Sequence, residues 1–211
     1  MLIVSLPADR LPADAGQVLR RIRRHLDRAE GFSLLFLFAA DDRAAADLRT
    51  QLDWLLRYHA RRLKTVDALG ADPDDATLSG WLGSSGRDGA LGGVWLDLLR
   101  RPAGQHGPDE DLDPARVAWL ALLNEQRSRL ERGLHCALFV VLPSRWQGLV
   151  WQVAPDLWTV RSLVGDVPVA VAAATEKVGA ETSSGSTYTG PLSKDRREAA
   201  REGAFDVFVS R

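Results

Sequence analysis

Cysteine is almost absent from this sequence: Cys136 is the single one among 211 residues. One thiol excludes an internal disulfide and a cysteine-based metal cage. A chain of this kind suits a reducing compartment, so we expect a cytoplasmic protein. Because Cys136 directly precedes an apolar run, we predict that it is a small core residue and not a nucleophile.

Long apolar runs are absent as well. No stretch approaches the roughly 18 uninterrupted apolar residues of a membrane-spanning helix. The short apolar start, Met1–Leu6, has no basic residues before it, unlike a secretion signal. We therefore expect neither export nor insertion into a membrane.

The sequence also lacks an excess of charge of either sign. It has 27 basic and 28 acidic residues, for a net charge of -1. This balance gives no electrostatic reason to expect nucleic acid or an anionic membrane as the main partner. Protein or small-molecule partners are favoured.

The patterns that are present alternate between strand and helix. Continuous apolar runs, typical of strands buried on both faces, occupy Ser33–Phe38 and Ala137–Leu142, with further strands predicted at Leu63–Ala68 and Val94–Leu99. Helical stripes are predicted over Ala13–Glu30, from Asp41 or Asp42 to about His59, and over Asp113–Gly133. Such alternation predicts a three-layer α/β domain with a mostly parallel sheet over residues 1–165.

Several local signals refine the helices. Asp72-Pro73 and Asp113-Pro114 each predict an N-cap followed by proline in the first turn. In the second of these helices Val117, Leu120, Leu123 and Leu130 are predicted to face inward. Ser144 is predicted to cap a helix that carries Trp146 and ends before Pro155.

The remainder of the chain differs in composition. Residues 166–203 are rich in small and charged residues, which predicts a flexible linker. Residues 204–211 contain the strand-like stretch Phe205–Ser210, predicted as the first strand of a further domain.

The turn after the first strand, Ala39–Asp47, lies where an open α/β fold binds its ligand. A phosphate loop needs glycines, a lysine and a magnesium-binding hydroxyl, and this turn has none of them. Its aspartates would also repel a triphosphate. We predict a helix-capping turn, and therefore no nucleotide cofactor.

Other candidate chemistry is weaker. Asp97 follows a predicted strand, where a magnesium-positioning carboxylate would lie, but without a phosphate loop we interpret it as an ordinary polar residue. Asp109, Asp111 and Asp113 alternate as in a calcium loop, yet Pro114 replaces the required glycine turn, so we predict a solvated loop. The four histidines lack metal-ligand spacing. We expect no catalytic residues and no metal site.

Four residues form a candidate interaction surface: Arg20, Arg24, Trp146 and Trp151. The arginines belong to a basic run from Arg20 to Arg28, which is most often a solvated helix face and next most often a protein docking site. Trp146 and Trp151 lie on different helix faces, so we expect one at the surface, where tryptophan marks interfaces.

Three segments, Leu122–Leu130, Ala137–Pro143 and Ala154–Ser162, resemble the inactive relatives of STAND ATPases, the signal-transduction ATPases with numerous domains. The resemblance covers about Arg20 to Val164. It implies a degenerate P-loop NTPase-like (Rossmannoid) sheet, with Phe38-Ala39 at the phosphate-loop position, Asp97 near the acidic-motif strand and Ser144 after the sensor strand. It also implies a regulatory or scaffolding role in bacterial multidomain proteins, often linked to phage defence.

Phe205–Ser210 resembles the opening strand of a Toll/interleukin-receptor (TIR) domain. The resemblance implies an effector attached at this end of the domain. A terminal strand that pairs with the domain's own sheet explains the same six residues equally well.

Three functions remain open from the sequence. The first is a non-enzymatic signalling module that acts through an attached effector or self-association. The second is a nucleotide-binding domain with an atypical phosphate loop. The third is a small-molecule enzyme whose catalytic residues are dispersed along the chain.

Overall fold

A five-stranded parallel sheet lies at the centre of the computed structural model, which describes residues 13–70, 73–87 and 90–169. The strands are β1 (Ser33–Ala39), β2 (Arg62–Asp67), β3 (Leu91–Asp97), β4 (Ala137–Pro143) and β5 (Leu163–Val167). They lie in the order β2-β3-β4-β1-β5, and every adjacent pair is parallel. The predicted α/β fold with a parallel sheet is confirmed.

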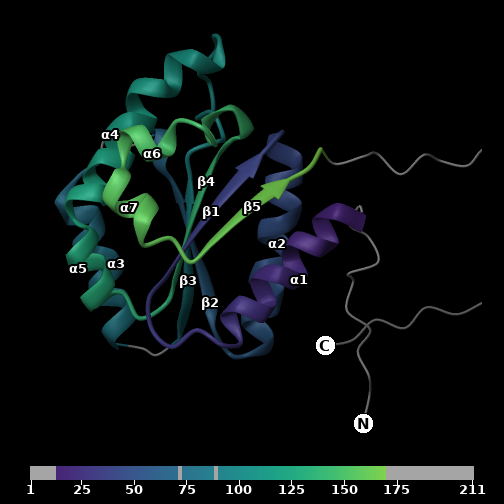
Figure 1. Cartoon of the computed structure of the whole chain (residues 1–211), viewed down its shortest axis with the longest axis vertical. Helices are drawn as coiled ribbons and strands as arrows, with labels where there is room; N and C mark the ends of the chain where they lie inside the picture. The colour runs from purple at the N-terminus through teal and green to yellow at the C-terminus, as the bar shows by residue number, and fades with distance from the viewer. Residues whose placement is uncertain (1–12, 71–72, 88–89, 170–211) are drawn as a thin grey trace, which may run out of the picture. The chain divides into compact units, whose positions relative to one another are not determined.

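Helices cover both faces of the sheet and complete the three layers (Figure 1). On one face lie α1 (Ala13–Leu26) and α2 (Asp42–Tyr58). The other face carries α3 (Asp75–Arg87), α4 (Asp113–Glu125), α5 (Arg127–Gly133), α6 (Val150–Val153) and α7 (Pro155–Thr159). Single turns of 3₁₀ helix occur at η2 (Ala68–Gly70), η3 (Asp109–Leu112) and η4 (Ser144–Trp146).

Burial on both faces explains the uninterrupted apolar sequences of the strands β1 and β4. Side chains alternate along a strand, so Phe36 and Phe38 of β1 pack into the core beneath α3–α7, and Leu35 and Leu37 pack beneath α1 and α2. All seven residues of β1 and of β4 are buried. A strand covered on both faces needs apolar residues at every position.

The connections leave neighbouring strands toward opposite faces. After β1 the chain enters α2 on one face, and after β4 it passes through η4, α6 and α7 on the other. In an open parallel sheet, a ligand is expected in the crevice that such a divergence opens at the carboxyl ends of the strands. The carboxyl ends of β1, β3 and β4 therefore form the place to examine for function.

Two predicted helix starts are corrected. The N-cap of α3 is not Asp72, which lies outside the described residues, but Asp74, whose Oδ1 accepts a hydrogen bond from the Thr77 amide at 2.7 Å. Asp113 is itself the first residue of α4, and its carboxylate makes no capping bond because arginines bind it.

Three further expectations differ from the structure. Val117 was predicted to face inward but is 41% exposed, because α4 turns Arg116 inward in its place. Ser144 opens η4 without a side-chain cap, and Pro155 begins α7 instead of following a helix end. The short strand β5 was not predicted, and it extends the sheet beyond residue 165.

Residues 170–211, which hold most of the predicted linker and the TIR-like stretch, lie outside the described residues. Among the residues that are described, no helix has the length and apolar character needed to span a membrane.

Candidate functional site at the carboxyl edge of the sheet

The turn from β1 into α2 is short. Asp41 is the N-cap of α2, and its Oδ1 accepts a hydrogen bond from the Ala44 amide at 2.7 Å. The preceding residue, Ala40, donates its amide to the Val167 carbonyl of β5 at 3.2 Å. These bonds occupy amides that a phosphate loop would direct at its ligand. The predicted helix-capping turn is confirmed.

Asp97, the last residue of β3, is buried and organises the turn that follows it. Its Oδ1 accepts hydrogen bonds from the amides of Leu99 at 3.1 Å and Arg100 at 2.9 Å. A carboxylate that bonds to amides two and three residues ahead is a local turn-forming group. This geometry favours a structural role for Asp97 over a magnesium-positioning one.

An open pocket of about 380 Å³ lies between the start of α2 and the end of β3. Arginine side chains on its lining would attract an anion, but the carboxylates of Asp42 and Asp97 oppose one. Partial burial, followed by the nearby charge of Asp97, raises the pKa of Asp42 above its ordinary value. The lining residues are Asp42, Arg43, Ala45, Ala46, Arg49, Asp97, Leu99 and Arg100.

Beside this pocket, a buried arginine is held by the loop after β3. Arg116 of α4 is 0% exposed, and its Nε donates to the Leu98 carbonyl at 2.9 Å. Its Nη2 donates to Asp109 Oδ1 at 2.6 Å, and its Nη1 to Asp113 Oδ1 at 2.8 Å. A buried guanidinium is tolerated only when its donors are bonded in this way.

A second arginine, from the turn after β4, completes a four-charge cluster of Asp109, Asp113, Arg116 and Arg145. Arg145 Nη2 lies 2.8 Å from Asp109 Oδ2 and 2.7 Å from Asp113 Oδ1. Trp146 donates its Nε1 to the same Asp113 oxygen at 3.0 Å. Two arginines and two aspartates neutralise each other, so the cluster presents little net charge to a ligand.

The ionisation of the cluster follows from these bonds. Partial burial opposes charge on Asp113, but hydrogen bonds from Arg145, Arg116 and Trp146 outweigh it and lower its pKa to about 2. At Asp109, burial is likewise outweighed by hydrogen bonds from the two arginines, and the pKa is lowered. The hydrogen bond to Asp113 raises the pKa of Arg145. Asp109, Asp113 and Arg145 are therefore charged at neutral pH.

No protein-family model matches this chain, and no curated protein sequence matches it. The proposal of a family therefore depends on the three segments that resemble inactive STAND relatives.

The remaining chemical candidates are placed as follows. Cys136 is buried behind the start of β4, and burial raises the pKa of its thiol to about 12, so it is not a ready nucleophile. Within residues 13–70, 73–87 and 90–169, no group of three or more histidine, cysteine or acidic side chains is arranged to hold a metal ion.

The four candidate interaction residues divide into exposed and buried ones. Arg20 and Arg24 are exposed on α1. Trp151 of α6 is 54% exposed, whereas Trp146 is 2% exposed and bonded to Asp113. Trp146 therefore cannot belong to a docking surface, while Leu149, 39% exposed and two residues before Trp151, adds an apolar neighbour.

The four-charge cluster was missed by sequence reasoning, which treated Asp109 and Asp113 as solvated. A signal was present in α4: Arg116 occupies an inward position four residues before Leu120 and seven before Leu123. An arginine on the apolar stripe of a helix requires acidic partners, and the nearest acids precede it in the loop.

Proposed function

We propose that this domain is a non-enzymatic regulatory or scaffolding module that relays a signal to an attached effector through protein–protein contact. The observation that carries the proposal is the four-charge cluster at the carboxyl edge. There two arginines and two aspartates bind each other, and the phosphate-loop position is a capped helix start. At this edge a capped helix start replaces the glycine-rich amides and the lysine that phosphoryl chemistry needs at the phosphate-loop position.

Exposed groups elsewhere supply the contact surface. Arg20 and Arg24 project from α1, and Trp151 of α6 and the preceding Leu149 are exposed apolar side chains. Tryptophan and arginine are the residues most often found to dominate binding energy at interfaces. A tethered effector needs no active site in the module, because clustering raises its effective concentration.

The setting we propose is bacterial anti-phage defence, on the resemblance to inactive STAND modules, with a TIR-like effector attached at the end marked by Phe205–Ser210. The alternative, a nucleotide-binding domain with an atypical loop, has one supporting observation. Arg43, Arg49 and Arg100 line the carboxyl-edge pocket.

The test compares two sets of variants in the protein that carries the effector. Arg20→Glu with Arg24→Glu, and separately Trp151→Ser, change the surface; Asp42→Asn and Arg100→Ala change the pocket. We expect the surface set to silence effector output while the pocket set leaves it intact, with all variants folded by circular dichroism. Loss of output in the pocket set alone would show that a ligand site, and not contact, drives the function.

A further inference from the structure

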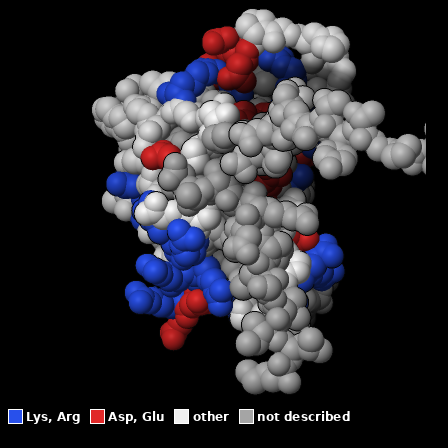
Figure 2. Space-filling model, turned by 90° about the vertical axis from the view of Figure 1, so that its right-hand side faces the viewer, with Lys and Arg blue, Asp and Glu red and all other residues white. Residues whose placement is uncertain are grey.

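A strongly basic surface lies at the opposite end of the sheet from the four-charge cluster. Arg20, Arg24 and Arg28 follow one another at intervals of four residues along α1 and the turn after it, so they line one side of the helix. Figure 2 shows blue side chains gathered on the side of the molecule where α1 lies. The whole chain has a net charge of -1. The basic surface on α1 therefore differs in sign from the chain as a whole.

These arginines have no acidic partners among the described residues. Arg23 pairs with Asp27 at 3.9 Å, but Arg20, Arg24 and Arg28 take part in no ion pair there. Like charges four residues apart on a helix repel each other and oppose helix formation. A negatively charged partner would remove that repulsion.

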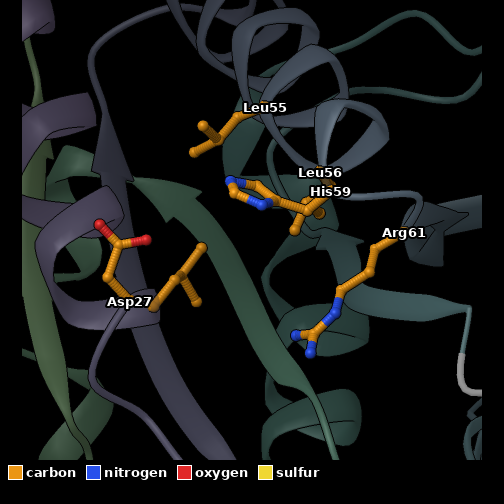
Figure 3. Close-up of a pocket in the computed structure, with 6 residues that line it drawn as sticks. Asp27, Leu55, Leu56, His59 and Arg61 are labelled. Atoms are coloured by element: carbon orange, nitrogen blue, oxygen red, sulfur yellow. The ribbon is translucent and has the colours of Figure 1, made fainter.

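A pocket of about 290 Å³ opens where α1 and α2 end. Leu26, Leu55 and Leu56 supply its apolar surface, and Asp27, His59 and Arg61 supply its polar groups. In Figure 3, Asp27 and Arg61 lie on opposite sides of this pocket, with the His59 ring between them. Arg61 also has no ion pair among the described residues, whereas the charge of Asp27 is offset by Arg23.

The wall that carries Arg61 depends on a glycine. A Cβ on Gly92 of β3 would lie 2.8 Å from Arg61 Cβ and 2.8 Å from Leu56 Cδ2. Without a side chain at that position, Arg61 and Leu56 lie directly against the strand. The pocket therefore places one guanidinium beside three leucines.

Deepening the proposed function, on which this step rests, we infer that the α1 arginines and the leucine pocket together bind an acidic segment of a partner protein that carries one large apolar side chain. The leucines contact the apolar side chain, and Arg61, on the lining of the pocket, donates hydrogen bonds to a carboxylate beside it. The α1 arginines attract the remaining carboxylates of the segment through their positive charge. Arginine suits this role because its planar guanidinium matches a carboxylate with two parallel hydrogen bonds. A pocket of about 290 Å³ has room for a single large side chain.

The test uses a short fluorescent peptide in which one leucine is flanked on each side by glutamates. Two matched peptides replace the leucine by serine or the glutamates by glutamine. Anisotropy titrations against the chain should give the tightest binding for the leucine–glutamate peptide, and this binding should weaken as salt is added.

The double variant Arg24→Glu with Arg61→Glu should weaken binding of this peptide by about tenfold, and the gentler Arg24→Gln with Arg61→Gln by about threefold. Arg132→Glu, on α5 across the sheet, is the control for a charge reversal away from this surface and should have no effect.

The pocket is tested by a double-mutant cycle. Leu26 is partly exposed, so Leu26→Ser leaves the fold intact, which its urea midpoint checks. Leu26→Ser should weaken binding of the leucine peptide by about fivefold and leave binding of the serine peptide almost unchanged. Equal effects on both peptides, equal loss in Arg132→Glu, or tighter binding of a single-stranded oligonucleotide of the same charge would each overturn the inference. If the peptide fails to bind but the surface variants still silence effector output, this inference alone falls and the proposed function stands.

Discussion

At the scale of single residues, Arg116 is the group on which the carboxyl edge depends. Its guanidinium is fully buried and joins α4 to the loop after β3 through Leu98 and Asp109, and it also binds Asp113 within α4. Removing one partner of a buried ion pair leaves other charges uncompensated, which is costly. Arg116 is therefore one of the groups that fix the conformation of this loop, together with Asp97 and Arg145.

We expect Arg116→Met to lower the free energy of unfolding by about 3 kcal/mol, because Asp109 and Asp113 lose a buried cation. Urea denaturation measures this value. The control Arg132→Met removes an exposed arginine from α5 and should change stability by less than about 0.5 kcal/mol. Equal effects of the two substitutions would show that burial of Arg116 contributes nothing.

Asp113 gives the fold a predicted dependence on acid. Its pKa is about 2 in the folded chain, below the ordinary value of 3.8. A carboxyl whose folded pKa is depressed stabilises the fold fully above its unfolded pKa, and that stabilisation is lost as pH falls toward the folded pKa. We expect stability to decline between about pH 5 and about pH 2, and Asp113→Asn to flatten that decline. Urea midpoints across this range measure it, and an unchanged slope in the variant would contradict the assignment.

At the scale of elements, the end of α2 contains a residue in an unfavourable conformation. Ala60 has a φ of 56°, and Arg61 donates its amide to the Leu56 carbonyl at 2.9 Å to close the helix. This is the left-handed position after a helix where glycine is usually found.

Ala60→Gly should raise the free energy of unfolding by roughly 0.5–1 kcal/mol, because relief of the left-handed strain exceeds the added entropy of the unfolded chain. Ala46→Gly, in the helical part of α2, is the matched control and should lower stability by about 1 kcal/mol. Urea denaturation of both variants gives the comparison. A destabilised Ala60→Gly variant would show that the bend at Ala60 is not strained.

The elements also show what the sequence could predict. β1 and β4 were predicted because burial on both faces requires an unbroken apolar run. β5 was missed because it is an edge strand of five residues containing Gly165 and Asp166, and its pairing with β1 is a long-range contact. Val117 was placed inward because the apolar pattern was assigned without Arg116. In the structure Arg116 occupies the buried side of α4, where its ion pairs hold it, and Val117 is exposed.

At the scale of the whole molecule, the two ends of the sheet differ in charge. At the carboxyl ends of the strands, Asp109 and Asp113 neutralise Arg116 and Arg145. At the amino ends, Arg20, Arg24, Arg28 and Arg61 take part in no ion pair among the described residues. The sequence predicted the helix-capping turn at the phosphate-loop position and the basic helix α1. It did not predict the cluster, because Arg145 comes from a distant turn, or the leucine pocket, because Leu26 of α1 meets the end of α2 there.

The central claim is that the carboxyl edge is not a nucleotide site, and calorimetric titration of the chain with magnesium ATP and magnesium GTP tests it most directly. We expect no heat beyond dilution up to about 1 mM nucleotide, since the turn Ala39–Asp47 has no glycine, lysine or hydroxyl and Asp41 caps α2 there. A micromolar dissociation constant that is lost in Arg43→Ala or Arg100→Ala, with the fold retained, would contradict the claim.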